Sequence, residues 1–191
     1  MAVGRSPRIN SLNLDSAGIS YTPKGIDVDD MMRTNKSNIF AIGDVNGKMM
    51  LAHVATYQGI RALNCICGTE DSIKFDVVPS AVFTVPECGM AGMTEDQCKS
   101  AGINIKIGQS FFRANGKALA LGEPDGICKL IFNAETERLI GIHIMGVQAA
   151  DLAQQGADLI NKEATLRQIK DIIFGHPTVS EVILNACHNV K

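Results

Sequence analysis

Residues 127–145 read ICKLIFNAETERLIGIHIM, two apolar segments joined by a short polar turn. Ile127–Phe132 and Leu139–Met145 have the length and composition of β-strands, and the short connection predicts that they pair antiparallel. Because side chains alternate along a strand, Ile140, Ile142 and Ile144 share one face of the second segment. An antiparallel sheet is therefore expected at the centre of the fold.

The segments around this pair extend the sheet and cover it with helices. Ser80–Val85 and Ile103–Phe112 are strand-like. Residues 148–162 predict a helix with a stripe of mostly small residues, suited to close packing: Ala149, Leu152, Ala153, Gly156 and Ile160. This order favours an α+β domain, an antiparallel sheet flanked by helices.

Three tetrapeptides have the spacing of a capping box, in which a threonine oxygen accepts a helix N–H and a Gln or Glu side chain reaches back. They are Thr94–Gln97, Thr165–Gln168 and Thr178–Glu181. Each predicts the start of a helix.

The polar stretch Gly68–Ser72 is the expected domain boundary, which divides the chain into residues 1–72 and 73–191. The first 35 residues are rich in turn formers. Ile39–Ile42 then predicts a short buried strand that ends at Gly43-Asp44, and residues 51–67 predict a helix. This order is that of an incomplete α/β domain, whose strand needs a sheet supplied from elsewhere.

Composition excludes several classes of protein. The chain has 191 residues, 46% of them hydrophobic and 20% charged, as in ordinary globular proteins. A net charge of -2 argues against nucleic acid as the main partner. No apolar run approaches the roughly 20 residues that span a bilayer, and the N-terminus does not read as a targeting signal. We therefore expect a cytoplasmic protein.

The six cysteines (Cys65, Cys67, Cys88, Cys98, Cys128 and Cys187) lack the spacing of a metal site or of a C-x-x-C redox pair. Reduced, buried thiols are favoured over a disulfide framework. No metal ligands are predicted.

His176-Pro177-Thr178-Val179-Ser180-Glu181 places an imidazole five positions before a carboxylate. Such a pair moves protons near neutral pH, with the carboxylate fixing the tautomer of the ring. Glu181 has an alternative role, because a carboxylate at this position of a capping box can bind helix amides instead. One carboxylate could serve both. The other histidines are weaker candidates: His143 fits a packed strand position and His188 a solvated one.

Thr34–Asp44 leads through the predicted strand into Gly43 and Asp44. A glycine lets a ligand approach the backbone, and a carboxylate can accept hydrogen bonds from sugar hydroxyls. A Gly-Asp turn after a strand is common by itself, but the eleven-residue pattern favours a ligand site.

These segments carry a family resemblance. Thr34–Asp44 resembles the second flavin motif of the FAD-dependent pyridine nucleotide–disulfide oxidoreductases, and Met50–His53 resembles the start of their flavin-contacting helix. Ala2–Pro7 is similar to their A-x-G-R-x-P segment, and His176–Glu181 to their His-Pro-x-x-x-Glu. The ending from His176 onward resembles the dihydrolipoamide dehydrogenase branch more than the glutathione reductase branch.

The resemblance implies roles for individual residues. His176 is the expected acid–base and Glu181 orients it; Pro177, after a cis bond in the family, aims the histidine. Asp44 is expected to bind the ribitol of FAD, with Gly43 allowing its approach. Leu51, Ala52 and His53 are expected near the isoalloxazine, mainly through backbone groups.

Several motifs of the family do not occur in this sequence, and this limits what we expect of the chain. Members of the family are more than twice as long, and neither a first FAD motif, a C-x-x-x-x-C redox pair nor an NAD fingerprint occurs here. The resemblance therefore implies the C-terminal part of an enzyme: the end of an FAD domain followed by an interface domain. Alone it should be inactive and should not retain FAD.

The complete enzyme would be a homodimer that oxidises a lipoyl-carrying protein of a 2-oxoacid dehydrogenase or glycine cleavage complex and reduces NAD. The alternatives are a non-catalytic dimerisation module, or the same chemistry on another disulfide such as glutathione.

Overall fold

The chain divides into two compact units, Met1–Phe75 and Asp76–Lys191. The computed structural model describes residues 3–191. The polar stretch Gly68–Ser72 lies shortly before the point of division. Each unit is described by itself below.

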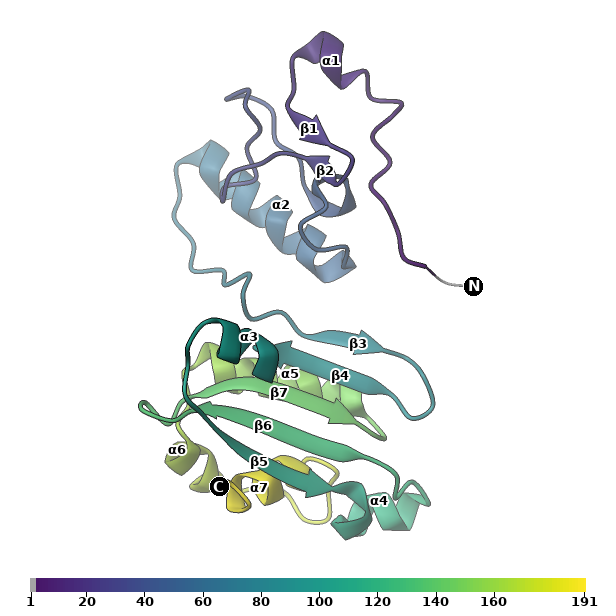
Figure 1. Ribbon diagram of the computed structural model, residues 1–191, viewed down its shortest axis with the longest axis vertical. Helices are drawn as coiled ribbons and strands as arrows, with labels where there is room; N and C mark the ends of the chain where they lie inside the picture. The colour runs from purple at the N-terminus through teal and green to yellow at the C-terminus, as the bar shows by residue number, and fades with distance from the viewer. Residues whose placement is uncertain (1–2) are drawn as a thin grey trace. The chain divides into compact units, whose positions relative to one another are not determined.

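The second unit is built on a five-stranded sheet in the order β3-β4-β7-β6-β5 (Figure 1). The strands are β3 (Ser80–Val82), β4 (Cys88–Gly92), β5 (Ile105–Phe111), β6 (Ile127–Asn133) and β7 (Leu139–Met145). All neighbouring strands are antiparallel. The predicted pair, β6 with β7, is confirmed, with Leu130 opposite Ile142 and an irregularity between Ile131 and Phe132.

Two strands are shorter than the sequence predicts. β3 ends at Val82, and the Thr84 hydroxyl donates to the carbonyl of Pro86 at 2.7 Å across the turn that follows. The pairing with β4 ends where Val82 lies opposite Cys88, so residues 83–85 belong to the turn between the two strands. β5 ends at Phe111, because the chain tightens into the 3₁₀ helix η2 (Phe112–Ala114), which precedes α4 (Gly116–Leu121).

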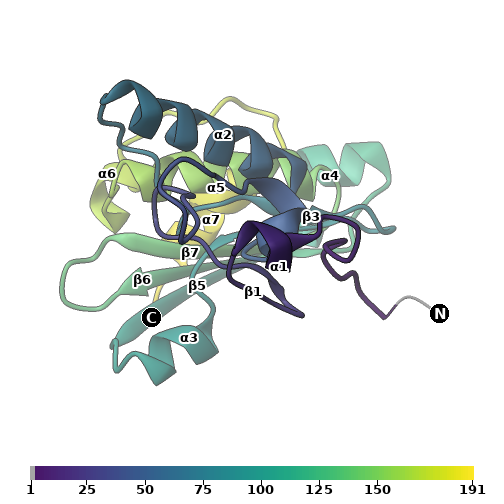
Figure 2. The ribbon, with the colours of Figure 1, turned by 90° about the horizontal axis from the view of Figure 1, so that it is seen from above.

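Helices cover one face of this sheet. α5 (Ala149–Asn161) packs on β4 and β7, α7 (Glu181–His188) packs on β5 and β6, and α6 (Leu166–Lys170) packs on α7. α3 (Glu95–Ser100) lies on the opposite face (Figures 1 and 2). The small-residue stripe of α5 is buried, as predicted.

Glycines in the strands let these helices approach closely. A Cβ added to Gly89 would lie 2.2 Å from the carbonyl oxygen of Ala149, at the start of α5. A Cβ added to Gly108 would lie 2.2 Å from the carbonyl oxygen of Ala186, in α7. The helix backbones therefore rest directly on β4 and β5, and the side chains between the layers form one core: Phe112, Leu130, Phe132, Ile142, Ile169, Val182 and Ile183 are among its fully buried members.

Two of the three predicted capping boxes are confirmed. The side chains of Thr94 and Thr165 accept N–H bonds at the starts of α3 and α6, and Gln97 and Gln168 reach back. The third predicted capping box, Thr178–Glu181, forms only on the Glu181 side, where the carboxylate accepts the N–H of Thr178. The Thr178 hydroxyl donates to the carbonyl of Gly175 at 2.7 Å, and α7 begins only at Glu181. The N-cap residue of α7 is Ser180 instead, and it provides no side-chain cap.

The C-terminal residues line the outer edge of the sheet. β5 is an edge strand, paired only with β6. The side chain of Asn189 donates to the carbonyl of Gln109 at 2.9 Å, and the N–H of Lys191 donates to the carbonyl of Ile107 at 3.2 Å. Two carbonyls on the free side of β5 are thereby satisfied.

The first unit contains α1 (Leu14–Ala17), the hairpin β1 (Tyr21–Thr22) and β2 (Gly25–Ile26), the 3₁₀ helix η1 (Gly43–Asn46) and α2 (Ala52–Cys67). Its small core comprises Ile9, Leu14, Ile26 and Ala41. The helix predicted at residues 51–67 is confirmed. Only part of its apolar stripe is buried, however, because Leu63 and Ile66 are 58% and 64% exposed.

The buried strand predicted at Ile39–Ile42 is wrong. This segment makes a single bridge, between Arg33 and Phe40, and Ala41 donates to the carbonyl of Met32 at 3.0 Å. Ile42 is 43% exposed. A buried strand needs neighbours on both sides, and the described residues supply one on one side only.

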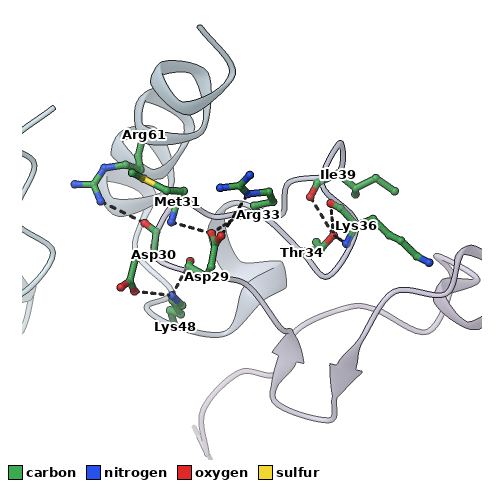
Figure 3. Close-up of polar contacts among 9 residues, drawn as sticks. All are labelled: Asp29, Asp30, Met31, Arg33, Thr34, Lys36, Ile39, Lys48 and Arg61. Carbon is green, nitrogen blue, oxygen red and sulfur yellow. Dashed lines mark hydrogen bonds and ion pairs between the residues drawn. The ribbon is translucent and has the colours of Figure 1, made fainter. Parts of the chain in front are cut away.

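Polar contacts brace the loop that leads to this segment (Figure 3). Asp29 accepts the N–H groups of Met31 and Arg33 at 2.9 Å each. Partial burial raises the pKa of Asp29, but these donors and the Arg33 guanidinium outweigh it, and the net shift is downward. Lys48 and Arg61 donate to the carbonyls of Asp29 and Asp30. The loop is thereby tied to the segment that follows η1 and to α2.

Candidate active site

His176 and Glu181 meet at the start of α7. Nδ1 of the imidazole lies 3.0 Å from Oε1 of Glu181. The side chain of His176 is 76% exposed and that of Glu181 is 23% exposed. The peptide bond between His176 and Pro177 is cis. The sequence thus correctly predicts which two side chains come together.

Glu181 serves both of the roles that its position suggested. While Oε1 faces the imidazole, Oε2 accepts the N–H of Thr178 at 2.9 Å. The Thr178 N–H, and then the hydrogen bond with His176, lower the pKa of the Glu181 carboxyl; partial burial opposes this, and the net shift is downward. Glu181 is therefore ionised at neutral pH and held at both oxygens.

This geometry fixes the chemistry available to His176. An ionised carboxylate can only accept, so Nδ1 of His176 must carry a proton in the contact with Glu181. In the neutral ring the lone pair then lies on Nε2, and the exposed ring can present it to a bound molecule. The pair can accept a proton at Nε2, and the carboxylate stabilises the resulting imidazolium.

The base of α7 is fixed to the sheet. The hydroxyl of Ser110, in β5, donates to the carbonyl of Val182 at 2.6 Å, and both residues are buried. Val179 is also buried. The backbone on either side of Glu181 is therefore anchored, which keeps the carboxylate in place beneath an exposed ring.

The other predicted site residues belong to the first unit. Gly43 opens η1 with a φ of 74°, a conformation that favours glycine. Its N–H donates to Oε1 of Gln58, in α2, at 2.7 Å, and Nδ2 of Asn46 donates to the same oxygen at 2.9 Å. Gln58 is only 2% exposed. Sequence reasoning missed it, although a glutamine on the buried face of a predicted helix is a signal of this kind of bond.

Asp44 follows on the exposed side of η1. Its carboxylate lies 4.0 Å from Nη1 of Arg5, and both side chains are more than half exposed. Such a pair is weak. The carboxylate of Asp44 is consequently available to accept hydrogen bonds from hydroxyl groups.

Leu51, Ala52 and His53 lie where α2 begins. Leu51 is its N-cap residue and provides no side-chain cap. The N–H groups of the first turn of a helix have no intrahelical acceptor, and they lie at the positive end of the helix dipole. The start of this 16-residue helix can therefore donate to an acceptor group on a ligand. Asp44 and this helix start suit the hydroxyls and carbonyls of a flavin cofactor.

The remaining candidates have structural positions. Nε2 of His143, in β7, lies 3.0 Å from the carbonyl oxygen of Met93, and His188 is exposed in α7. All six cysteines are free. Residues 3–191 contain no cluster of three or more His, Cys, Asp or Glu that could hold a metal ion. Across the same residues, every helix is too short or too polar to cross a membrane.

Comparison with known families gives two matches along the chain. Residues 78–187 match the family described as pyridine nucleotide-disulphide oxidoreductase, dimerisation domain. Residues 1–59 match the family described as pyridine nucleotide-disulphide oxidoreductase. The first match includes both His176 and Glu181, and the second includes Gly43, Asp44 and the start of α2.

Curated relatives and solved structures agree with these matches. The chain is 38% identical to dihydrolipoyl dehydrogenase 3 of Haloarcula marismortui, over 100% of this chain and 40% of the relative. It is 38% identical to dihydrolipoyl dehydrogenase of Bacillus subtilis, over 97% of this chain and 41% of the relative. The chain thus spans about two fifths of their length.

Two solved structures are similar to nearly the whole chain. LpdA of Mycobacterium tuberculosis has a TM-score of 0.90 at 26% identity, with 98% of this chain and 41% of LpdA covered. The flavoprotein disulfide reductase RclA of Escherichia coli also has a TM-score of 0.90 at 26% identity, with 100% of this chain and 44% of RclA covered. From the site, the fold and these matches, the chain belongs to the pyridine nucleotide-disulphide oxidoreductases, and residues 78–187 are their dimerisation domain.

Proposed function

We propose that this chain supplies the dimerisation domain and the acid–base pair of an FAD-dependent dihydrolipoyl dehydrogenase. The observation that carries the proposal is the His176–Glu181 contact, which leaves Nε2 of an exposed ring as the proton acceptor. The names of the curated relatives favour dihydrolipoamide as the dithiol that is oxidised.

His176 acts first in this proposal. Its Nε2 takes a proton from a substrate thiol, and the thiolate so formed is the nucleophile that attacks an enzyme disulfide. Glu181 stabilises the imidazolium and keeps the ring oriented, and Pro177 sets the direction of the histidine. In the proposed homodimer, His176 completes the active site of the other subunit.

Gly43, Asp44, Leu51, Ala52 and His53 would contribute to FAD binding. Asp44 accepts hydrogen bonds from ribityl hydroxyls, and the start of α2 donates to the flavin. FAD, when bound, carries electrons from the dithiol to NAD. Because a first FAD motif and a redox cysteine pair do not occur among these 191 residues, we propose that this chain alone neither retains FAD nor turns over substrate.

The proposed partners are a second copy and a lipoyl-carrying protein of a 2-oxoacid dehydrogenase or glycine cleavage complex. Exposed apolar side chains in the second unit support a contact surface: Val82, Phe83, Val85, Met90, Phe111, Met145 and Ile173. The six free thiols fit a reducing compartment, so the cytoplasm is the proposed location.

The experiment joins this chain to the N-terminal part of the Bacillus subtilis relative, the part that this chain does not cover. The joined protein is assayed for NAD reduction by dihydrolipoamide, with the flavin spectrum recorded in parallel. We expect His176→Gln to abolish turnover and leave the flavin bound. His188→Gln changes an exposed histidine of α7 and is the matched control, with activity like the parent. Equal activity of His176→Gln and the parent contradicts the proposal.

Two alternatives are separated by simple measurements. If the chain is a dimerisation module without a catalytic role, it forms a dimer in analytical ultracentrifugation, but His176→Gln has no effect on the joined enzyme. If the substrate is another thiol couple, glutathione supports faster turnover than dihydrolipoamide. Stoichiometric flavin together with dihydrolipoamide-dependent NAD reduction by the 191-residue chain itself would overturn the proposal that the chain alone is inactive.

A further inference from the structure

A buried asparagine lies beneath the His176–Glu181 loop. Asn115 stands between η2 and α4 and is 2% exposed. Its Oδ1 accepts the N–H of Ala118 at 2.9 Å and caps α4, while its Nδ2 donates to the carbonyl of Thr178 at 3.0 Å. Asn115 and Thr178 are 63 positions apart in the sequence. The amide of Asn115 thus joins the start of α4 to the middle of the loop.

Thr178 is the point through which this bond reaches the histidine. Its carbonyl is held by Asn115, its N–H donates to Oε2 of Glu181 at 2.9 Å, and its hydroxyl donates to the carbonyl of Gly175 at 2.7 Å. All three polar groups of Thr178 are therefore used. Two of these bonds reach the surroundings of His176. The hydroxyl bonds to Gly175, the residue before the histidine, and the N–H bonds to Glu181, its carboxylate partner.

The support beneath Asn115 is rigid. Its N–H donates to the carbonyl of Phe112 at 2.8 Å, and Phe112 is fully buried. A Cβ added to Gly126 or Gly146 would come within 2.8 Å of the Phe112 ring, so the backbone presses against that ring from two sides. A close-packed interior yields little to displacement. Asn115 is therefore well placed to hold Thr178, which is distant from it in the sequence, in a fixed position.

We propose that Asn115 is a positioning residue of the candidate active site: it holds Thr178, and through Thr178 and Glu181 it fixes the orientation and the tautomer of His176. This rests on the proposed function for its consequence in catalysis, but the positioning itself is measurable in this chain. Asn115 does not touch the ring. Its effect passes through one backbone carbonyl.

The test measures the tautomer of His176 by NMR, in the 191-residue chain labelled with ¹⁵N-histidine, at a pH where the ring is neutral. The resonances of His176 are assigned with His176→Gln. In the parent we expect the proton on Nδ1, which the contact with Glu181 requires. Asn115→Ser keeps a capping oxygen on α4 but does not reach Thr178. We expect the Nδ1–H fraction to fall toward its value in the urea-unfolded chain.

Two further variants separate positioning from stability. Asn115→Asp keeps the cap and the size of the side chain but turns an oxygen toward the Thr178 carbonyl, and we expect the same loss of the Nδ1–H tautomer. Thr94→Ala removes the cap of α3, at the other end of the sheet structure, and should lower stability comparably without changing the tautomer. Folded Asn115 variants that keep the parent tautomer would overturn the proposal.

A measurement on the parent keeps the proposal testable if both variants unfold. The side-chain amide protons of Asn115 should exchange with solvent much more slowly than those of exposed amide side chains, because one of them is bonded to Thr178. Rapid exchange would contradict the proposal. Failure of the proposed function would give another result. The tautomer of His176 would still depend on Asn115, while His176→Gln would not change the activity of the joined enzyme.

Discussion

The side-chain oxygen of Gln58 accepts the N–H of Gly43 at 2.7 Å, which fixes the turn carrying Asp44 against α2. The same oxygen also accepts Nδ2 of Asn46. Removing it leaves two donors without their acceptor in a buried place, and such groups cost about 1–3 kcal/mol each. Gln58→Leu should therefore expose residues 41–48 to faster amide hydrogen exchange.

The matched control for this change is Gln154→Leu, because Gln154 is an exposed glutamine of α5 whose side chain donates to Asp158 on the same helix. Hydrogen exchange monitored by mass spectrometry resolves the affected peptides. Unchanged exchange at residues 41–48 in Gln58→Leu would show that the bond to Gly43 does not hold the turn.

The carboxyl of Glu181 makes stability depend on pH. Its pKa is lowered from 4.5 in the folded chain, so it binds a proton more readily when unfolded. Its contribution is fully present above pH 4.5 and is lost as the pH falls through the folded pKa. In urea unfolding we expect the free energy of unfolding to fall more steeply with acidification in the parent than in Glu181→Gln. Exposed Glu135→Gln is the control and should follow the parent.

Two glycines of the second unit, one in the sheet and one in a helix, predict opposite effects of substitution by alanine. Gly89→Ala places a methyl group 2.2 Å from the carbonyl oxygen of Ala149, and that backbone can yield only if α5 moves. Overpacking of this kind costs about 1–3 kcal/mol. Gly116→Ala, in α4, meets nothing within 4 Å and should stabilise by up to about 1 kcal/mol. Denaturant midpoints of the two variants, shifted in opposite directions from the parent, would support this account of the sheet–helix contact.

The cysteines should differ in reactivity. Burial raises the pKa of Cys187 to about 12, and burial, then the neighbouring Cys187, raises the pKa of Cys128 as well. Cys98 is also buried, and its pKa is raised for the same reason. Cys67 is exposed. Because the thiolate is the reactive form, brief treatment with N-ethylmaleimide should label Cys67 first and leave the three buried thiols intact until the chain is unfolded. Mass spectrometry of tryptic peptides reads this order directly.

Much of the second unit could be predicted because its signals are local. The alternation in Leu139–Met145, the threonine caps at Thr94 and Thr165, and the small residues of α5 each depend on neighbours a few positions away. The contact between His176 and Glu181 could also be predicted from the sequence, since a spacing of five residues around a helix start brings the two side chains close. The double use of the Glu181 carboxylate could be predicted as a possibility, but the folded structure is needed to assign each oxygen to its partner.

The failures have a common physical origin in contacts between distant segments. The composition of Ile39–Ile42 is that of a buried strand, yet burial depends on partners, and the described residues pair this segment on one side only, with Met32, Arg33 and Thr34. The Thr178 hydroxyl has a local alternative acceptor in Gly175, which a capping pattern does not weigh. Gln58 and Asn115 bond to residues 15 and 63 positions away, and no pattern within one segment contains that information.

The bonds from Asn189 and Lys191 to the outer edge of β5 have a practical consequence for handling the protein. Open strand edges recruit other strands and start aggregation. Here Asn189 and Lys191 occupy that border, so a tag or a deletion that displaces residues 189–191 would leave more of the edge free to pair with another sheet. Expression work on this domain is better served by a tag placed elsewhere.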